Sequence, residues 1–585
     1  MCDSERQVPW WREAVVYQIW PKSFYSARGT STGDIQGIIE KLDYLKSLGV
    51  DTVWLSPHYA SPMVDEGYDI SDYQDINPLF GTLADADELI KQCHDRQMRV
   101  IFDLVAAYTS DQHKWFQESC SAAEGNPKRD WYIWRPAKVD ANGNRRPPTN
   151  WASSFGGSAW EWNEERQQYY LHTYTKQQPD LNWRNEECRK AIYENAIEFW
   201  LKRGLDGFRV DTCNIYSKPE VFTNAPITKP EAEWQSPDSI IANGPHIHEY
   251  LKEMGQIFEK YDAVSVGELG RSTSTEEALK YVASSAKELS MVFLFDVVNM
   301  GRVKGEKFTP KPWTVSELAK LTEKLQTYVD DHDAWQTTLL ESHDTARSVS
   351  RFSNDSLKFH SISAKMLCVY TVMLSGTLFL YQGMDIAMTN IPSFWGQEEY
   401  LDVQTINFLK EQREKGKSET EINQLMRGIN LLARDNARTP VQWGDGPNAG
   451  FTAANAKPWM RINDNYKQVN IAQQETDGDS VLNFYRKAIA VRKQYPALFI
   501  NGKFSLLLYY DDKHEGSKVL AFAKLDQSHS EEKSFPKAIV LLNFSAGMQD
   551  VPIDGLQEGK VLLSNYSPDE PSERLQPYES RVMIL

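Results

Sequence analysis

The 585-residue sequence predicts an α/β fold, a (β/α)₈ TIM barrel, with an inserted domain after the third strand and a C-terminal antiparallel β domain. Two patterns along the chain predict the barrel. Short apolar segments rich in Val, Ile and Phe recur, as expected for parallel strands that are buried on both faces. Segments with apolar residues at helical spacing separate them, as expected for helices that cover such a sheet.

Eight segments are predicted to form the strands of the barrel. In chain order they are 15–19, 51–57, 99–105, 207–211, 263–269, 292–297, 336–343 and 377–383. An open, doubly wound sheet is the alternative, and a Gly-rich phosphate-binding loop often follows its first strand. Residues 26–33 hold only two glycines and lack the Lys-Ser/Thr pair of a P-loop, which favours the closed barrel.

The helical spacing is clearest in three stretches, 38–49, 187–204 and 314–331. Gly49 is predicted to end the first of these helices. The most apolar run of the chain, 366–381, is shorter than the roughly 20 residues that span a bilayer, and Ser375 and Gly376 interrupt it. It predicts a buried helix that leads into a buried strand.

Two stretches depart from the alternation of strands and helices. Residues 106–177 are rich in Trp, Tyr, Gly, Asn and Pro, with little helical periodicity, and are predicted to form a domain inserted after the third strand. The segments 506–510, 518–525, 537–544 and 581–585 are predicted to be strands of a small antiparallel domain. The predicted units are the barrel in two parts, 1–105 and 178–505, the inserted domain, 106–177, and the C-terminal β domain, 506–585.

Composition excludes several classes of partner and compartment. The chain has 64 basic and 81 acidic residues, a net charge of −17, which argues against nucleic acid or an anionic membrane as a partner. Six scattered cysteines without a CxxC pair indicate reduced thiols rather than a disulfide framework or a zinc site. The first residues lack the apolar segment of a signal peptide, so we expect a cytoplasmic protein.

Three carboxylates are predicted to lie at the ends of barrel strands, where the active sites of such barrels are found. They are Asp211, Glu268 and Asp344. Glycoside hydrolysis needs a nucleophilic carboxylate and a carboxylic acid that protonates the leaving oxygen. Arg209 precedes Asp211 by two residues on a strand, so it shares the same face and could keep that carboxylate ionised. With 81 acidic residues, a purely structural role is the alternative.

Seven motifs resemble those of a known family. In chain order they are WWREAVVYQIWPKSF, GYDISDYQDINPLFGT, QPDLNW, GFRVDT, SVGE, HDTARSVSRF and ARDNARTPVQW. Together, from residue 10 to about 450, they resemble the α-amylase superfamily, glycoside hydrolase family 13. The resemblance is to its oligo-1,6-glucosidase/maltase branch, which includes the fungal α-glucosidases. The tail is similar to the C-terminal β domain of that family.

The resemblance implies roles for the three carboxylates. Asp211 is similar to the nucleophile, Glu268 to the general acid/base, and Asp344 to the third carboxylate that holds sugar hydroxyls. The residues implied to surround the terminal glucose are Tyr68, Asp69, Arg209, His343 and Arg434. For Tyr68, a core aromatic is the alternative to stacking on a sugar. The implied reaction is a two-step displacement that retains the α configuration through a covalent glucosyl-enzyme.

The residue after the nucleophile, Thr212, implies a linkage preference. Members with Val there tend to cut α-1,6 links and those with Thr α-1,4 links, so the resemblance implies a maltase-like enzyme. The chain departs from the family at several other positions. Ala107-Tyr108 replaces Asn-His, where the histidine usually contacts the terminal glucose, so Tyr108 is a candidate sugar contact with one hydroxyl. Ser342, Thr345-Ala346 and Met384-Asp385 are further departures.

Many family members carry a D-x-N-x-D calcium loop after the first strand. Here the matching positions are Ser26, Arg28 and Thr30, and only Asp34 is left. An arginine would repel calcium, so we expect no structural calcium and no cofactor.

The sequence thus predicts a retaining α-glucosidase that acts on small α-glucosides, with maltose-type α-1,4 links preferred and sucrose as a further candidate. The first alternative is a transglucosylase that uses the same intermediate. Sucrose isomerisation is less favoured because the charged Arg/Asp loop motif of those members is absent. A non-catalytic member is the third alternative, although such transporter-associated chains have lost the carboxylates that are present here. The sequence does not distinguish a monomer from a homo-oligomer.

Overall fold

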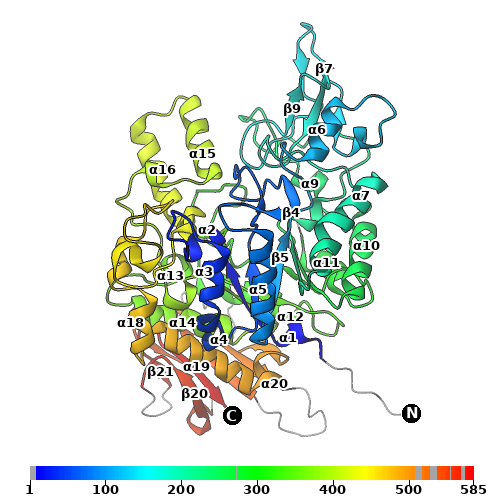
Figure 1. The fold of residues 1–585 in the computed structure, drawn as a ribbon. Coiled ribbons are helices and arrows are strands. Elements are labelled where there is room, and N and C mark those ends of the chain that lie inside the picture. The colour runs from blue at the N-terminus through cyan, green and yellow to red at the C-terminus, as the bar shows by residue number, and fades with distance from the viewer. Residues whose placement is uncertain (1–7, 272, 508–516, 527–536, 554, 568–572) are drawn as a thin grey trace, which may run out of the picture.

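The computed structural model describes residues 8–271, 273–507, 517–526, 537–553, 555–567 and 573–585. An eight-stranded parallel sheet forms a nearly closed barrel at its centre (Figure 1). Its strands are β1 (Val15–Ile19), β2 (Thr52–Leu55), β5 (Arg99–Leu104), β11 (Gly207–Val210), β12 (Val264–Glu268), β13 (Met291–Phe293), β14 (Thr337–Thr338) and β15 (Thr377–Tyr381). Their order is β13-β12-β11-β5-β2-β1-β15-β14. The predicted (β/α)₈ barrel is confirmed, and each of the eight predicted segments overlaps a strand.

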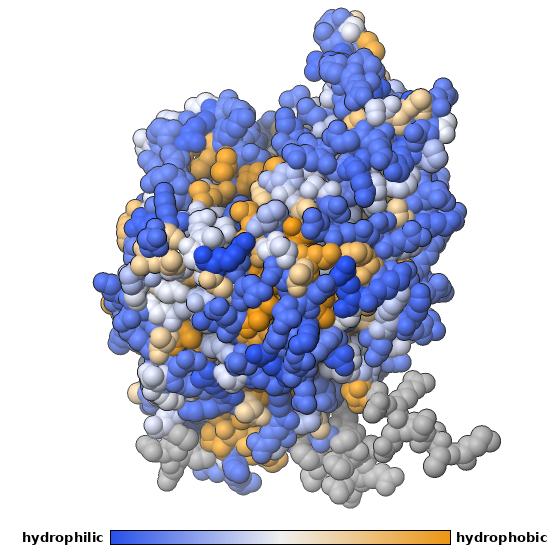
Figure 2. Space-filling model, viewed as in Figure 1, coloured by the Kyte–Doolittle hydropathy of each residue, from blue (hydrophilic) through white to orange (hydrophobic). Residues whose placement is uncertain are grey.

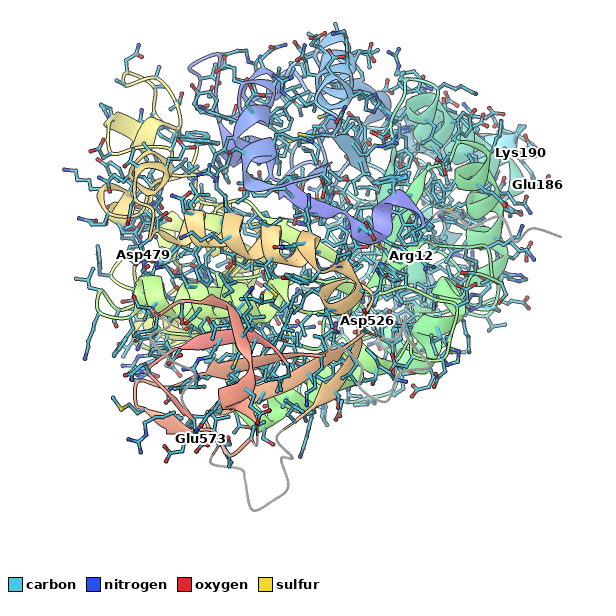
Figure 3. The ribbon with its side chains drawn as sticks, turned by 90° about the horizontal axis from the view of Figure 1, so that it is seen from below. Arg12, Glu186, Lys190, Asp479, Asp526 and Glu573 are labelled. Carbon is cyan, nitrogen blue, oxygen red and sulfur yellow. The ribbon has the colours of Figure 1, made fainter. Side chains whose placement is uncertain are left out.

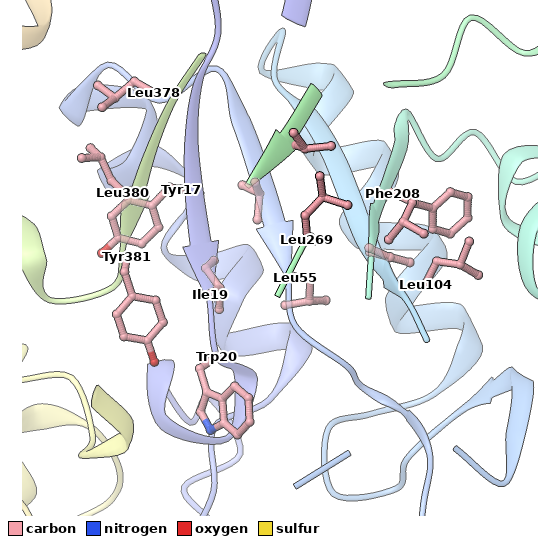
Figure 4. Close-up of a cluster of buried hydrophobic side chains, with 14 of the residues drawn as sticks. Tyr17, Ile19, Trp20, Leu55, Leu104, Phe208, Leu269, Leu378, Leu380 and Tyr381 are labelled. Atoms are coloured by element: carbon pink, nitrogen blue, oxygen red, sulfur yellow. The ribbon is translucent and has the colours of Figure 1, made fainter. Parts of the chain in front are cut away.

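Side chains alternate between two apolar layers along each strand. In β1, Val15, Tyr17 and Ile19 face the surrounding helices, whereas Val16 belongs to a separate cluster inside the barrel. Figure 4 shows several outward residues of β1, β2, β5, β11 and β15 together. The inner cluster includes Val16, Trp54, Ile101, Val266, Met291, Phe293 and Phe379. Because the side-chain period of a strand is two, these buried strands carry apolar residues at nearly every position.

Helices cover the outside of the barrel. They include α3 (Ile35–Glu40), α4 (Leu42–Leu48), α5 (Leu83–Asp95), α7 (Glu186–Ile192), α8 (Phe199–Leu201), α10 (Ile247–Lys260), α11 (Thr275–Val282), α12 (Val315–Thr327), α14 (His360–Val372) and α19 (Val481–Gln494). Gly49 ends α4 as predicted, in a left-handed conformation with φ of 98°, where its missing Cβ also leaves room for Ile489. A π-helical segment, Tyr193–Glu198, joins α7 to α8 within the predicted helix 187–204.

The residues after β5 form the predicted insertion at the end of the barrel where the strands end (Figure 1). It contains α6 (Lys114–Ser121) and a three-stranded antiparallel sheet of β6 (Trp134–Arg135), β10 (Gln168–Leu171) and β9 (Trp160–Asn163). A small ribbon, β7 (Lys138–Val139) and β8 (Arg145–Arg146), projects from it. The exact domain boundaries stay predictions.

A second excursion at the same end was not predicted from the sequence. After β15 the chain forms two helices, α15 (Val403–Glu414) and α16 (Glu419–Leu432), around an apolar cluster of their own. Figure 1 shows them opposite the inserted domain. Asn407 of α15 donates a hydrogen bond to the Phe155 carbonyl at 3.2 Å, so the two excursions meet above the barrel.

The C-terminal sheet is antiparallel, with the strand order β16-β17-β18-β22-β20. The bounds are Lys503–Leu506, Val519–Leu525, Lys537–Asn543, Ser580–Ile584 and Lys560–Ser564 in that order. The predicted strands 518–525, 537–544 and 581–585 are confirmed, whereas most of 506–510 lies outside the described residues. The sheet packs against α12 and α14 at the opposite end of the barrel from the two excursions.

The outer surface carries mainly polar side chains, which cover most of the face in Figure 2. Exposed ion pairs are common on it: Glu186 and Lys190, at the edge of the view in Figure 3, lie 2.8 Å apart. Such a pair contributes at most about 1 kcal/mol to stability. No helix among the described residues is long and apolar enough to cross a membrane. The five described cysteines are free thiols, as predicted.

Buried Arg492 of α19 joins α14, β15 and the segment before the C-terminal sheet. Its guanidinium donates to the backbone carbonyls of Val372, Leu374 and Phe499 at 2.6–2.8 Å and also to that of Gly376. Carbonyls that end a helix lack partners within it, and here a single cation satisfies several of them.

We expect Arg492→Met to lower stability by at least about 3 kcal/mol, because each buried carbonyl left without a partner costs about 1–3 kcal/mol. Urea and thermal unfolding would measure the loss. The control is Lys487→Met on the exposed side of the same helix, which should change the midpoint little. Equal unfolding midpoints for the two variants would contradict the stabilising role of the Arg492 hydrogen bonds.

Candidate active site

The inner face of the barrel turns from apolar to polar at the ends of its strands. Val264, Val266 and Glu268 point inward at successive alternate positions of β12, the first two within the apolar cluster. On β5 the same alternation leads from Ile101 to Asp103. The ionisable groups at the strand ends therefore lie directly above the buried apolar cluster inside the barrel.

Arg209 on β11 lies at the centre of these groups. Its Nη1 is 2.6 Å from Asp103 Oδ1 and 2.7 Å from Asp211 Oδ1, and its Nη2 contacts Glu268 Oε2. The side chains of Arg209, Asp103 and Asp211 are at most 4% exposed. One buried cation thus contacts three carboxyl groups from three neighbouring strands or strand ends.

Asp211 accepts hydrogen bonds on both of its oxygens. Oδ1 faces Arg209, whereas Oδ2 accepts from the hydroxyls of Tyr108 at 3.0 Å and Thr212 at 3.1 Å. The predicted contact of Arg209 with Asp211 is present. Burial nevertheless raises the pKa of Asp211, since the desolvation of the carboxylate exceeds what Arg209 and Tyr108 offset.

Thr212 connects the two neighbouring carboxyl groups. Its backbone N–H donates to Glu268 Oε2 at 3.3 Å while its hydroxyl donates to Asp211. Its φ of 39° and ψ of 40° lie in the left-handed region, which a β-branched residue rarely adopts. Strained backbone of this kind persists only where the surroundings enforce it, and it clusters at functional sites.

Glu268 has a pKa suited to proton transfer near neutrality. Burial raises it to about 7, with Asp211 and Asp344 adding to the rise and Arg209 opposing it. Burial likewise raises the pKa of Asp103 to about 6, although Arg209 acts in the other direction. One guanidinium does not keep three buried carboxyl groups ionised, so a proton is shared among them.

A second cluster holds Asp344 at the rim. Arg434 donates to Asp402, Asp344 and Asp65 at 2.7, 3.0 and 2.9 Å, one carboxylate for each nitrogen of its guanidinium. Arg438 adds contacts to Asp402 at 2.6 Å and to Asp344 at 3.2 Å. Burial alone would raise the pKa of Asp344, but His343 and the two arginines hold it well below its usual range.

His343 lies between two aromatic rings and is fixed at both nitrogens. Its ring stacks on Trp20 and Tyr68 at 5.3 and 5.4 Å. Gln18 Nε2 donates to Nδ1 at 2.7 Å, so Nε2 carries the proton towards Asp344 Oδ2 at 3.1 Å. The Tyr68 hydroxyl is 2.7 Å from the same Nε2, which places that ring beside the carboxylates.

The structure brings together nearly all of the predicted site residues. The assembled residues are Asp211, Glu268, Asp344, Tyr68, Tyr108, Arg209, Thr212, His343 and Arg434. Asp69 differs, because its two oxygens accept the backbone N–H groups of Val64 and Asp65 and so hold its own loop. Asp65, four residues earlier, is the acidic residue of that loop that reaches Arg434.

Four residues of the site were missed by sequence reasoning: Asp65, Asp103, Asp402 and Arg438. A signal existed for two of them. Asp103 is the one charged residue within the apolar core of the segment 99–105, at an inward position. Arg438 follows Arg434 by four residues, one helical turn along α17 (Asp435–Arg438). Asp402 belongs to the unpredicted excursion and gave no such signal.

The described residues around Asp34 do not suit a calcium ion. Asp34 Oδ1 accepts the Gly37 N–H at 2.7 Å and so caps α3, while Oδ2 receives the Ser26 hydroxyl and the Arg28 N–H at 3.2 and 3.1 Å. Calcium needs six to eight oxygen ligands, whereas this loop presents donors and a cation. Elsewhere in the described part of the chain, no three His, Cys, Asp or Glu side chains form a candidate metal cluster.

Comparison with known proteins supports the interpretation of this geometry. A family model described as the α-amylase catalytic domain matches residues 18–501. An α-glucosidase of Candida albicans is 48% identical over 582 residues, which cover 98% of this chain and 99% of that protein. An oligo-1,6-glucosidase of Parageobacillus thermoglucosidasius is 42% identical over 587 residues, 98% of each chain. The crystal structure of a trehalulose synthase variant matches with a TM-score of 0.90 at 36% identity, over 99% of this chain and 100% of that one.

Proposed function

The chain belongs to the α-amylase family and is a glycoside hydrolase, as its motifs predict, and we propose that it is a retaining α-glucosidase. It releases α-glucose from the non-reducing ends of short α-glucosides. The observation that carries this proposal is the contact of one guanidinium with both Asp211 and Glu268, together with the rise of the Glu268 pKa to about 7. The named relatives act as α-glucosidases and oligo-1,6-glucosidases, which supports the same conclusion.

In the first step Asp211 attacks the anomeric carbon and forms a C–O bond to it. The bond from that carbon to the leaving oxygen breaks, and the oxygen takes its electron pair and the proton of Glu268. A pKa of about 7 keeps Glu268 substantially protonated in the free enzyme, so it can donate this proton.

In the second step Glu268, now ionised, takes a proton from water, and the water oxygen attacks the anomeric carbon. The bond to Asp211 breaks and its electron pair returns to the carboxylate, so two inversions retain the α configuration. Both transition states carry positive charge on the sugar ring. Six carboxyl groups surround three arginines at this site, an excess of negative charge that favours such a cation.

We propose a preference for α-1,4 over α-1,6 links, because Thr212 follows the nucleophile and its hydroxyl donates to Asp211 Oδ2 at 3.1 Å. Transglucosylation is the second candidate function. The match with a trehalulose synthase structure favours keeping it, since the same glucosyl-enzyme would pass glucose to a sugar instead of water.

We further propose that the enzyme needs no metal or other cofactor, since the bonding of Asp34 supports a loop closed by protein donors. Its substrates are small α-glucosides rather than nucleic acid or membranes. A cytoplasmic location is proposed from the buried free thiols of the described residues, which suit a reducing compartment.

Time-resolved proton NMR with maltose, isomaltose, nigerose, kojibiose and sucrose tests the function. We expect α-glucose to appear before mutarotation, and maltose to be cleaved faster than isomaltose. The matched control is Glu268→Gln, which should lower the rate on maltose by about 10²–10⁴-fold without unfolding the chain. β-Glucose as first product, or full activity of the variant, would overturn the mechanism. Oligosaccharides as the main early product would favour transglucosylation.

The pH profile of kcat/KM should be bell-shaped. Activity should fall above pH about 7, because Glu268 must be protonated to donate. It should fall on the acidic side as Asp211 becomes protonated, at a higher pH than an exposed aspartate would require. An aryl α-glucoside with a good leaving group needs less protonation, so its alkaline limb should be weaker than that of maltose. Identical alkaline limbs would contradict the role of Glu268.

Removal of metal ions should leave the enzyme unchanged. Treatment with EDTA is expected to alter neither the thermal midpoint nor the rate on maltose, since both oxygens of Asp34 already have protein partners. A midpoint that falls with EDTA and recovers with added calcium would show that a structural calcium exists.

A further inference from the structure

Tyr108 occupies a position that the sequence suggested for a sugar contact, but its hydroxyl bonds to the protein. It donates to Asp211 Oδ2 at 3.0 Å, and the residue is only 2% exposed. Its ring packs on Tyr174 of the inserted domain, with 5.1 Å between ring centroids. A backbone bridge between Tyr108 and Asp180 holds the segment in place.

The two oxygens of Asp211 are used unequally. Oδ2 accepts the hydroxyls of both Tyr108 and Thr212, which occupy its two lone pairs. Oδ1 accepts from Arg209 at 2.7 Å and from no other side chain of the described residues. Arg209 uses the same Nη1 for Asp103 and its Nη2 for Glu268, so its charge is divided among three carboxyl groups.

We infer that Tyr108 is a positioning residue for the nucleophile: its hydroxyl stabilises the ionised carboxylate of Asp211 and so favours the step that regenerates it. This inference rests on the proposed function. The packing of Tyr108 between Asp211 and Tyr174 supports it, because the hydroxyl has a fixed direction and little contact with solvent.

The two steps respond in opposite directions to such a donor. Asp211 loses its negative charge when the bond to the anomeric carbon forms, so a donor on the free carboxylate opposes the first step. In the second step water attacks, the bond to Asp211 breaks, and the carboxylate recovers its charge, so the donor assists. Tyr108 therefore slows the formation of the glucosyl-enzyme and speeds its hydrolysis, so less of this intermediate accumulates.

Other charged and titratable groups that face Asp211 stay in place when the hydroxyl alone is removed. They are Arg209 on its own strand, Asp103 from β5, Glu268 from β12, Asp344 from the segment after β14, Cys213 and Tyr216 from the segment after β11, Tyr174 from the inserted domain, Tyr73 from β4 (Asp72–Ile76) and Tyr68 from the loop before it. Since their contributions are unchanged, loss of one donor raises the pKa of the carboxylate.

The test is Tyr108→Phe, which keeps the ring against Tyr174 and removes one hydroxyl. We expect the acidic limb of the pH profile of kcat/KM to move to higher pH by about one unit, which corresponds to the loss of one hydrogen bond to a charged group. With p-nitrophenyl α-glucoside, intact-protein mass spectrometry during turnover should show a larger glucosylated fraction than in the wild type. The matched control is Tyr170→Phe, a buried tyrosine of the inserted domain whose hydroxyl donates to the Lys176 carbonyl.

A second variant covers the case in which Tyr108→Phe does not fold. 3-Fluorotyrosine at position 108 keeps the shape and is a stronger donor, so the acidic limb should move down. If the wild type is active and the acidic limb does not move in Tyr108→Phe, or in the 3-fluorotyrosine variant where Tyr108→Phe does not fold, Tyr108 has only a packing role and the inference is overturned. A wild type without activity on any α-glucoside would instead refute the proposed function.

Discussion

The site depends on one buried guanidinium that contacts more carboxyl groups than it can neutralise. Arg209 holds Asp103, Asp211 and Glu268 at hydrogen-bonding distance in a region almost closed to water. Complete ionisation would leave two unbalanced negative charges there, which low solvation makes unfavourable. The pKa values of Asp103 and Glu268 rise accordingly to about 6 and about 7. A protonated acid beside a carboxylate nucleophile therefore follows from the excess of carboxyl groups over cations, and no separate feature is needed for each group.

At the rim of the site, too, the ratio of arginines to carboxylates sets the pKa values, but here the ratio is higher. Arg434 and Arg438 face Asp65, Asp344 and Asp402, so cations are more numerous per carboxylate than around Arg209. Asp344 accordingly has a pKa well below its usual range, although it is the most exposed of the three proposed catalytic carboxylates. The resulting gradient keeps the outer group ionised and leaves the proton on the inner one. A sugar between them would meet fixed negative charge on one side and an acid on the other.

Strand periodicity made most of this architecture predictable. Glu268 and Arg209 could be placed from sequence because they are the last and the penultimate residues of short apolar strands whose inward positions alternate. The contacts made by side chains from irregular segments could not be predicted in this way. The contact of Asp65 with Arg434 was not predicted, because only the turn of the loop decides that Asp65 reaches Arg434 while Asp69 accepts backbone N–H groups of the same loop. The helix α16 buries Ile422 and Ile429 at helical spacing, but the contact of its neighbour α15 with the inserted domain, from Asn407 to the Phe155 carbonyl, follows from no local pattern.

The backbone at Thr212 explains how the two carboxyl groups are kept distinct. A left-handed conformation costs a β-branched residue about 1–2 kcal/mol, so it is retained only if other contacts outweigh that cost. In this conformation the N–H of Thr212 points at Glu268 while the hydroxyl points at Asp211. With an extended backbone, the N–H would no longer point at Glu268 while the hydroxyl points at Asp211. Together with the hydroxyl of Tyr108, this places two neutral donors on the nucleophile and, among the described residues, one on the acid. Hydrogen bonding thus reinforces the difference in proton affinity that the shared guanidinium begins.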